Sequence, residues 1–115
     1  MNKKIKGIYL IEFNNGIKVG HSNNCLERIR TYLSPWCREI INAYYLECHY
    51  PKLVEKQVLN RYKRNIKTEY STEFITDVSL KELMDYGYSK RNVSHKGMWQ
   101  NSHWYSDVVW SVFKK

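Results

Sequence analysis

Hydrophobic and polar residues alternate along residues 7–13 and 16–21, as in half-buried β-strands. The two segments flank Asn15-Gly16, a dipeptide typical of tight hairpin turns. Pairing across this turn predicts Phe13 opposite Lys18. Side chains of a strand alternate between its two faces, so the predicted faces carry Tyr9, Ile11, Phe13 and Lys18 on one side, and Ile8, Leu10, Ile17 and Val19 on the other. Tyr9 and Lys18 are therefore expected to share a surface, and the opposite surface is the more apolar of the two.

Apolar residues then recur every three or four positions, which predicts helices. Asn24 is a candidate N-cap, and Glu27 completes a capping-box pattern. Pro51 suits the first position of a second helix, with Glu55 beside its apolar stripe. The predicted elements are a helix over about 24–33, a strand over 40–48, a helix over 51–64, a short strand or turn over 71–75 and a short helix over 80–86. The segment 101–113 fits a helix about as well as a strand, and a helix is favoured.

These elements predict an α/β fold with a central three-stranded, mainly antiparallel sheet flanked by helices. We expect the core of this fold at about 7–76 and a helical C-terminal extension over 77–115. No internal repeat, low-complexity tract or Pro/Gly/Ser-rich linker interrupts the 115 residues, so we expect one domain over 1–115.

The charge balance narrows the class of partner. The chain carries a net charge of +8, and 43% of its residues are hydrophobic. A packed, strongly basic body of this size favours a polyanion as partner, because neutralising phosphates releases counterions. The alternative is that the charge serves solubility alone. The ten tyrosines and four tryptophans include side chains able to stack on bases, although most are expected in the core.

The number and spacing of the cysteines and the hydropathy of the chain predict a cytoplasmic location. Cys25, Cys37 and Cys48 form no C-x-x-C pair, which argues against a disulfide framework and a structural zinc site. The N-terminal stretch has no apolar region, and no segment approaches a membrane span. We expect a cytoplasmic protein with no membrane association, located in the cytoplasm of the host cell if it is encoded by a phage.

Several spaced motifs resemble one family. The first strand carries Gly7-Ile8-Tyr9, and the second carries Lys18-Val19-Gly20. The remaining matches are Arg28 eight residues after Gly20, Tyr32 four residues later, Glu55 in the second helix, and the segment TEFI at 72–75. Together these are similar to a GIY-YIG nuclease domain whose second motif reads K-[IV]-G, and TEFI is similar to a segment of its phage-associated branch. The resemblance covers about 7–76.

The resemblance implies a catalytic set of Tyr9, Lys18, His21, Arg28, Tyr32 and Glu55. Tyr9 is the candidate acceptor of a proton from water, provided that a cation such as Lys18 lowers the pKa of its phenol. Arg28 and Tyr32 would hold the scissile phosphate. Glu55 would be the ligand of one Mg²⁺ or Mn²⁺ ion.

Each residue also has a plain structural interpretation. Tyr9 and Lys18 suit any strand, and Arg28 with Tyr32 could be an exposed helix pair. Strict alternation puts His21 on the apolar face, so it is expected to reach the site only if its strand ends at Gly20. Glu55 could instead pair with a neighbouring lysine. The histidine often found four residues after the family's glutamate is replaced by leucine, and Asn60 and Asn65 are only loose matches to its late polar residue.

Basic residues recur along the second predicted helix and its exit, and again in the C-terminal part, where aromatic residues are interleaved. This mixture suits contact with a phosphate backbone and stacking on bases. The alternative for the first run is a solvated helix face. The candidate nucleic-acid-binding residues are Lys56, Lys63, Arg64, Lys67, Lys90, Arg91, Lys96 and Trp99.

These observations predict a Mg²⁺-dependent DNA endonuclease encoded by a phage or mobile element. One site nicks one strand, so double-strand cutting would require two copies, as in a homodimer. The first alternative is a catalytically silent DNA-binding or regulatory protein on the same fold. The second is a protein-binding factor with a basic surface.

Overall fold

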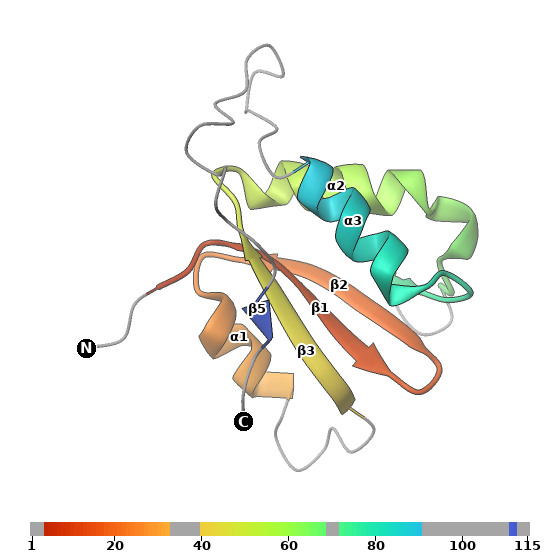
Figure 1. Ribbon diagram of the computed structural model, residues 1–115, viewed down its shortest axis with the longest axis horizontal. Helices are drawn as coiled ribbons and strands as arrows, with labels where there is room; N and C mark the ends of the chain where they lie inside the picture. The colour runs from red at the N-terminus through yellow and green to blue at the C-terminus, as the bar shows by residue number, and fades with distance from the viewer. Residues whose placement is uncertain (1–3, 33–39, 69–71, 91–110, 113–115) are drawn as a thin grey trace.

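The computed structural model describes residues 4–32, 40–68, 72–90 and 111–112 (Figure 1). These residues form an antiparallel sheet in the order β4-β2-β1-β3-β5 together with three α-helices. The strands are β1 (Gly7–Phe13), β2 (Gly16–Ser22), β3 (Ile40–Glu47), β4 (Phe74–Ile75) and β5 (Ser111–Val112). The helices are α1 (Cys25–Tyr32), α2 (Pro51–Arg61) and α3 (Leu80–Lys90), and a 3-10 turn, η1 (Lys63–Asn65), follows α2.

The β1–β2 hairpin has the predicted faces but not the predicted register. Phe13 pairs with Gly16, and Ile11 rather than Phe13 pairs with Lys18. Asn14 and Asn15 therefore form the turn, and Gly16 is the first residue of β2. A Cβ atom at Gly16 would lie 2.4 Å from the Phe74 ring, so glycine allows a close approach of β4 here. The error in register is two residues, and an even shift leaves every side chain on its predicted face.

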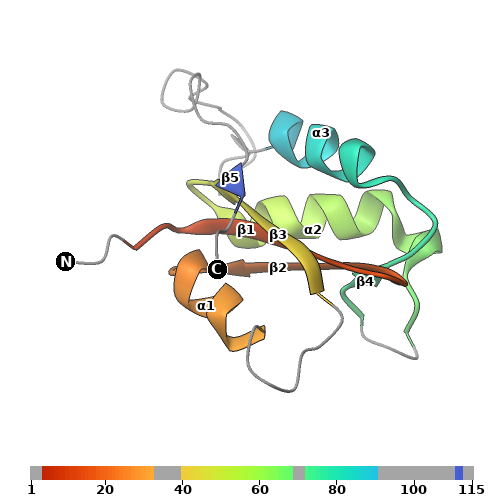
Figure 2. The same ribbon diagram turned by 60° about the horizontal axis from the view of Figure 1, so that its bottom comes forward.

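The helix α1 covers one face of the sheet (Figure 2). It begins as predicted, because the Asn24 side chain accepts a hydrogen bond of 3.3 Å from the Glu27 backbone N–H. Cys25 and Ile29 are fully buried against Tyr9 and Ile11 of β1. The face predicted to carry Tyr9 and Lys18 is therefore the face beneath α1.

The helices α2 and α3 lie on the opposite face, where α3 packs on α2 (Figure 2). Val54 and Val58 of α2 are buried as predicted, and Leu10 and Val19 of the hairpin lie beneath the two helices. This second, larger core contains most of the aliphatic side chains. It fixes α2 across β1 and β2 and so determines where Glu55 lies.

The predicted three-stranded sheet is present as β1, β2 and β3, but the short strands β4 and β5 extend it at both edges. The preference for a helix over 101–113 is wrong at Ser111–Val112, which pairs with Tyr44 and Tyr45 of β3. Alternating valine and aromatic residues allow this pairing. The rest of that segment, with residues 91–110, lies outside the described residues. Within the described ranges, no helix has both the length and the apolar character to cross a membrane.

Candidate active site

The phenol of Tyr9 lies directly over the backbone of Gly20, its partner across the hairpin. A Cβ atom at Gly20 would lie 2.3 Å from both Cζ and the hydroxyl oxygen of Tyr9, so only glycine leaves room for this ring. Tyr9 is 2% exposed. Its position thus depends on the spacing of the GIY and KVG motifs along two paired strands.

The helix α1 brings Tyr32 and Arg28 to the Tyr9 phenol. The rings of Tyr9 and Tyr32 are 6.0 Å apart between centroids and tilted by 48°. Burial, and then the neighbouring Tyr32 hydroxyl, raise the pKa of Tyr9 well above its ordinary value, while the charge of Arg28 works to lower it. Arg28 itself is exposed. The two residues predicted to hold a phosphate therefore lie beside the predicted proton acceptor.

The prediction that Lys18 lowers the pKa of Tyr9 is wrong. The Lys18 ammonium forms an ion pair with Glu73 Oε1, and the pKa of Tyr9 is raised. The cation that opposes this rise is Arg28, and burial outweighs it. Lys18 lies on the expected face, but its charge is engaged by a carboxylate that follows it by 55 positions.

On the other face, His21 contacts Glu55 through Nδ1 and Glu55 Oε1. Strand β2 extends to Ser22, and His21 pairs with Ile8 on the apolar face. The expectation that His21 reaches the site only if the strand ends at Gly20 is therefore wrong, because Glu55 approaches on this same face. An ionised carboxylate only accepts hydrogen bonds, so Nδ1 is the donor when Glu55 is ionised.

Glu55 is a buried carboxylate with 5% of its surface exposed. Its Oε2 atom is buried and has no hydrogen-bond partner among the described residues. Burial raises the pKa of Glu55; the hydrogen bond to His21 opposes this rise, and the charge of Glu73 adds to it. Glu55 thus faces His21 and Glu73 rather than a neighbouring lysine of α2.

Glu73 connects the two sides of the hairpin. Its backbone carbonyl accepts a hydrogen bond of 2.9 Å from the Val19 N–H, where the pairing of β2 toward β4 ends. Its charge acts on Tyr9 beneath α1 and on Glu55 beneath α2. We call Lys18, His21, Glu55 and Glu73 the edge cluster. Glu73 was absent from the predicted site, and the only signal for it was its place in the TEFI segment before a short strand.

The edge cluster fits a hard divalent cation. Mg²⁺ is usually bound by one or two carboxylates, with waters and phosphate oxygens completing its coordination. The orphaned Oε2 of Glu55 is the kind of atom that such an ion would satisfy. In the described part of the chain, no group of three or more His, Cys, Asp or Glu side chains is arranged to hold a metal.

Of the predicted nucleic-acid-binding residues, Lys56 lies on the outer side of α2 and is exposed. Lys63, Arg64 and Lys67, in and after η1, are also exposed. Lys90 ends α3, with its Nζ 5.4 Å from the centre of the Tyr86 ring. Arg91, Lys96 and Trp99 lie outside the described residues.

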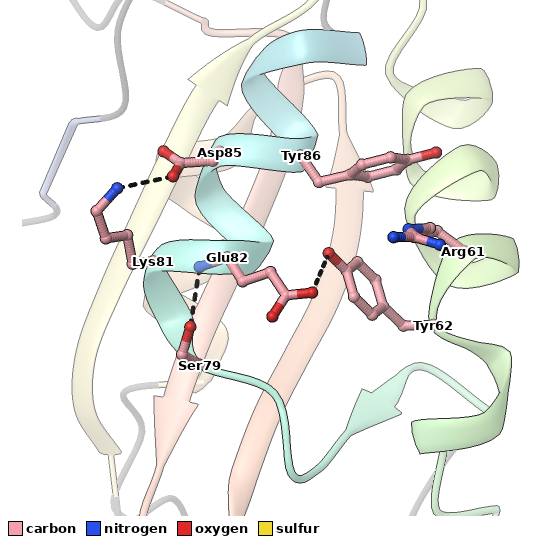
Figure 3. A pocket seen from close by; sticks show the side chains of 7 residues that line it. All are labelled: Arg61, Tyr62, Ser79, Lys81, Glu82, Asp85 and Tyr86. Atoms are coloured by element: carbon pink, nitrogen blue, oxygen red, sulfur yellow. Dashed lines mark hydrogen bonds and ion pairs between the residues drawn. The ribbon is translucent and has the colours of Figure 1, made fainter.

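A hollow of about 490 Å³ lies elsewhere, between the end of α2 and the start of α3 (Figure 3). It is lined by Arg61, Tyr62, Ser79, Lys81, Glu82, Asp85 and Tyr86. None of these belongs to the predicted catalytic set. The hollow and the edge cluster are thus separate places on the molecule.

No known family, curated protein or solved structure matches this chain in sequence or fold comparison.

Proposed function

We propose that this protein is a Mg²⁺-dependent endonuclease that hydrolyses phosphodiester bonds in DNA, on a fold similar to the GIY-YIG nuclease domain. The observation that carries the proposal is the grouping of chemically matched side chains around one end of the hairpin. Tyr9, Arg28 and Tyr32 adjoin on one face, and Glu55 contacts His21 on the other. Glu73 interacts with groups on both faces.

Hydrolysis requires a water oxygen to attack phosphorus while one P–O bond of the diester breaks. Arg28 is exposed and can present two N–H groups to the oxygens of the scissile phosphate. Tyr32 adds a hydroxyl donor beside it. Both groups would stabilise the charge that develops on the phosphorus oxygens in the transition state.

Tyr9 is neutral before substrate binds, because burial and Tyr32 raise its pKa. Its hydroxyl first orients the attacking water through a hydrogen bond. Transfer of the water's proton to Tyr9 then requires added positive charge nearby, and Arg28 is the residue that already lowers the pKa. The charge of Lys18, engaged by Glu73, would stabilise the leaving oxygen once that pairing is loosened by substrate.

Glu55 would hold the divalent ion, with His21 orienting the carboxylate through Oε1. When bound, such an ion supplies a Lewis acid that lowers the pKa of water and neutralises phosphate charge. The exposed lysines and arginine after α2 would bind the DNA backbone outside the site.

The test is a plasmid-nicking assay with supercoiled DNA and Mg²⁺. We expect nicking by the unaltered protein, and loss of nicking in both Tyr9→Phe and Glu55→Ala. Tyr44→Phe is the matched control, because Tyr44 lies on the neighbouring strand β3, on the face opposite Tyr9. The endonuclease proposal fails if the unaltered protein cannot nick DNA with either Mg²⁺ or Mn²⁺.

A second candidate is a catalytically silent DNA-binding protein on the same fold. The engaged charge of Lys18 and the raised pKa of Tyr9 favour it. A gel-mobility shift of plasmid fragments without any nicking would support this candidate. A shift that Lys63→Glu with Arg64→Glu abolishes would assign the exit of α2 to backbone contact.

A further inference from the structure

One oxygen of the buried Glu55 carboxylate lacks a hydrogen-bond partner in the described part of the chain. A buried oxygen without a partner carries the full cost of its lost hydration. Oε1 is engaged by His21 Nδ1, but Oε2 is buried without a hydrogen-bond partner in the described part of the chain. A proton at Oε2 would remove this cost in the free protein, and a bound divalent cation would take the place of that proton.

A second carboxylate faces Glu55. Glu73 is held beside β2 by its backbone hydrogen bond to Val19 and reaches Lys18 with Oε1. Its charge acts on Glu55, and the two carboxyl groups can hydrogen-bond only while Glu55 keeps a proton, which Oε2 would have to carry. Glu73 therefore contacts Lys18 and adjoins Glu55, which makes its carboxylate the candidate for a second metal ligand.

Two carboxyl groups side by side do not both ionise easily unless a cation lies with them. The Lys18 ammonium pairs with Glu73, and its side chain is only 15% exposed. An ionised carboxylate offers about four lone-pair sites, so a contact with Lys18 does not exhaust its capacity. The ammonium thus occupies a place where the charge of a metal ion would serve both acids.

We propose that Glu55 and Glu73 together bind one hard divalent cation, Mg²⁺ or Mn²⁺, and that Lys18 competes with this ion for Glu73. Oxygen ligands alone select such cations over softer metals. Two carboxylates leave room for waters and for a phosphate oxygen, as a substrate-binding ion requires. This inference deepens the proposed nuclease function and rests on it, but it adds a ligand from outside the predicted site.

The test is a titration of the full chain with Mn²⁺ alone, without DNA. Binding is measured by calorimetry and by the electron paramagnetic resonance signal of free Mn²⁺. We expect one ion per chain. Glu55→Gln and Glu73→Gln should each weaken binding by at least about tenfold, because each removes a charged ligand. The matched control Glu47→Gln removes an exposed carboxylate of β3 and should bind Mn²⁺ like the unaltered protein.

A second variant, expected to strengthen Mn²⁺ binding rather than weaken it, keeps the proposal testable if the Glu73→Gln protein does not fold. Lys18→Met removes the competing ammonium and should tighten Mn²⁺ binding by about fivefold, the size of a partly exposed ion pair. A purely structural role of Glu73 predicts no tightening. Unchanged or weaker binding in Lys18→Met overturns the proposal, as does unaltered Mn²⁺ binding in a folded Glu73→Gln.

The nicking assay separates this proposal from the proposed function. If the unaltered protein nicks DNA while Glu73→Gln binds Mn²⁺ normally, the endonuclease stands and the two-carboxylate site is wrong. If Mn²⁺ binding needs both carboxylates but no condition gives nicking, the cation site stands and the endonuclease is wrong.

Discussion

The edge cluster and the hollow between α2 and α3 each include a residue of α2, and they differ in how their polar groups are satisfied. In the hollow, the Tyr62 hydroxyl donates to Glu82, and Lys81 pairs with Asp85 on the same helix (Figure 3). The guanidinium of Arg61 lies 5.8 Å from the Tyr62 ring centre and 5.9 Å from that of Tyr86. In the edge cluster, a carboxylate oxygen is buried without a partner.

This difference separates a structural hollow from a candidate site. The hollow is a concavity of about 490 Å³, but its polar groups stabilise one another, and the hydrogen bond from Tyr62 to Glu82 holds α3 on α2. The edge cluster keeps a buried carboxylate oxygen without a hydrogen-bond partner, which a folded chain retains only at a cost. On this ground the edge cluster, rather than the hollow, is the region where we expect a ligand to bind. The substitutions below test whether the candidate site and the hollow differ in this way.

The largest effect is expected for Arg28→Ala. This change removes a charge that would stabilise the transition state, and it should lower the nicking rate about a hundredfold, or about 3 kcal/mol. The fold should be unaffected, since Arg28 is exposed. Arg30→Ala, an exposed arginine of the same helix, is the control and should nick DNA at nearly the unaltered rate. Equal loss in both variants would contradict a specific role for Arg28.

Gly20→Ala comes next. The added methyl group would lie 2.3 Å from the Tyr9 hydroxyl and cannot be accommodated without moving the ring. Overpacking of this kind should reduce the free energy of unfolding by about 1–3 kcal/mol. Urea denaturation measures the loss. Adding Tyr9→Val should restore stability but not nicking, and failure of that rescue would show that the two residues are not in conflict.

The buried thiol beneath the site gives a pH dependence. Burial raises the pKa of Cys25 from near 9 to about 12, with a weak opposing effect of the Gly7 backbone. The neutral thiol is thus favoured in the folded state, so its contribution to stability is complete below pH 9 and is lost as the pH rises toward 12.

Urea unfolding of the unaltered protein and of Cys25→Ala, at pH 8 and pH 10.5, measures this effect. The stability advantage of the unaltered protein should be smaller at pH 10.5. A constant difference between the two proteins at both pH values would contradict the raised pKa.

The smallest effect is expected for Tyr62→Phe in the hollow. It removes the 3.1 Å hydrogen bond to Glu82 and should cost about 0.5–1.5 kcal/mol of stability. Nicking should not change, because the hollow is assigned a structural role. A large loss of nicking at unchanged stability would instead assign this hollow to substrate binding.

The strands and helices of the core could be predicted because local rules determine them. The cap at Asn24, Pro51 at the start of α2 and the buried stripe of Val54 and Val58 all follow from short-range sequence patterns. The register of the hairpin could not be predicted, because Gly16 resembles a turn glycine but serves the contact with Phe74. That contact joins residues far apart in the chain.

The same distinction holds for the site. Spacing along the hairpin was enough to put Tyr9 and Lys18 on one face, since alternation in a strand is a local property. The partners of those side chains depend on tertiary structure. Glu73 captures Lys18, and Glu55 reaches His21, only because β4 and α2 pack against β2.

The shortness of β4 and β5 has a consequence for solution behaviour. In the described part of the chain, each of these outermost strands pairs two of its residues with the longer strand beside it. A long outer strand can offer a row of unpaired amides to another molecule and so promote fibre growth. Because β4 and β5 pair with so few positions of β2 and β3, the charge of +8 on each copy is the feature that opposes such pairing, since crowded molecules repel one another.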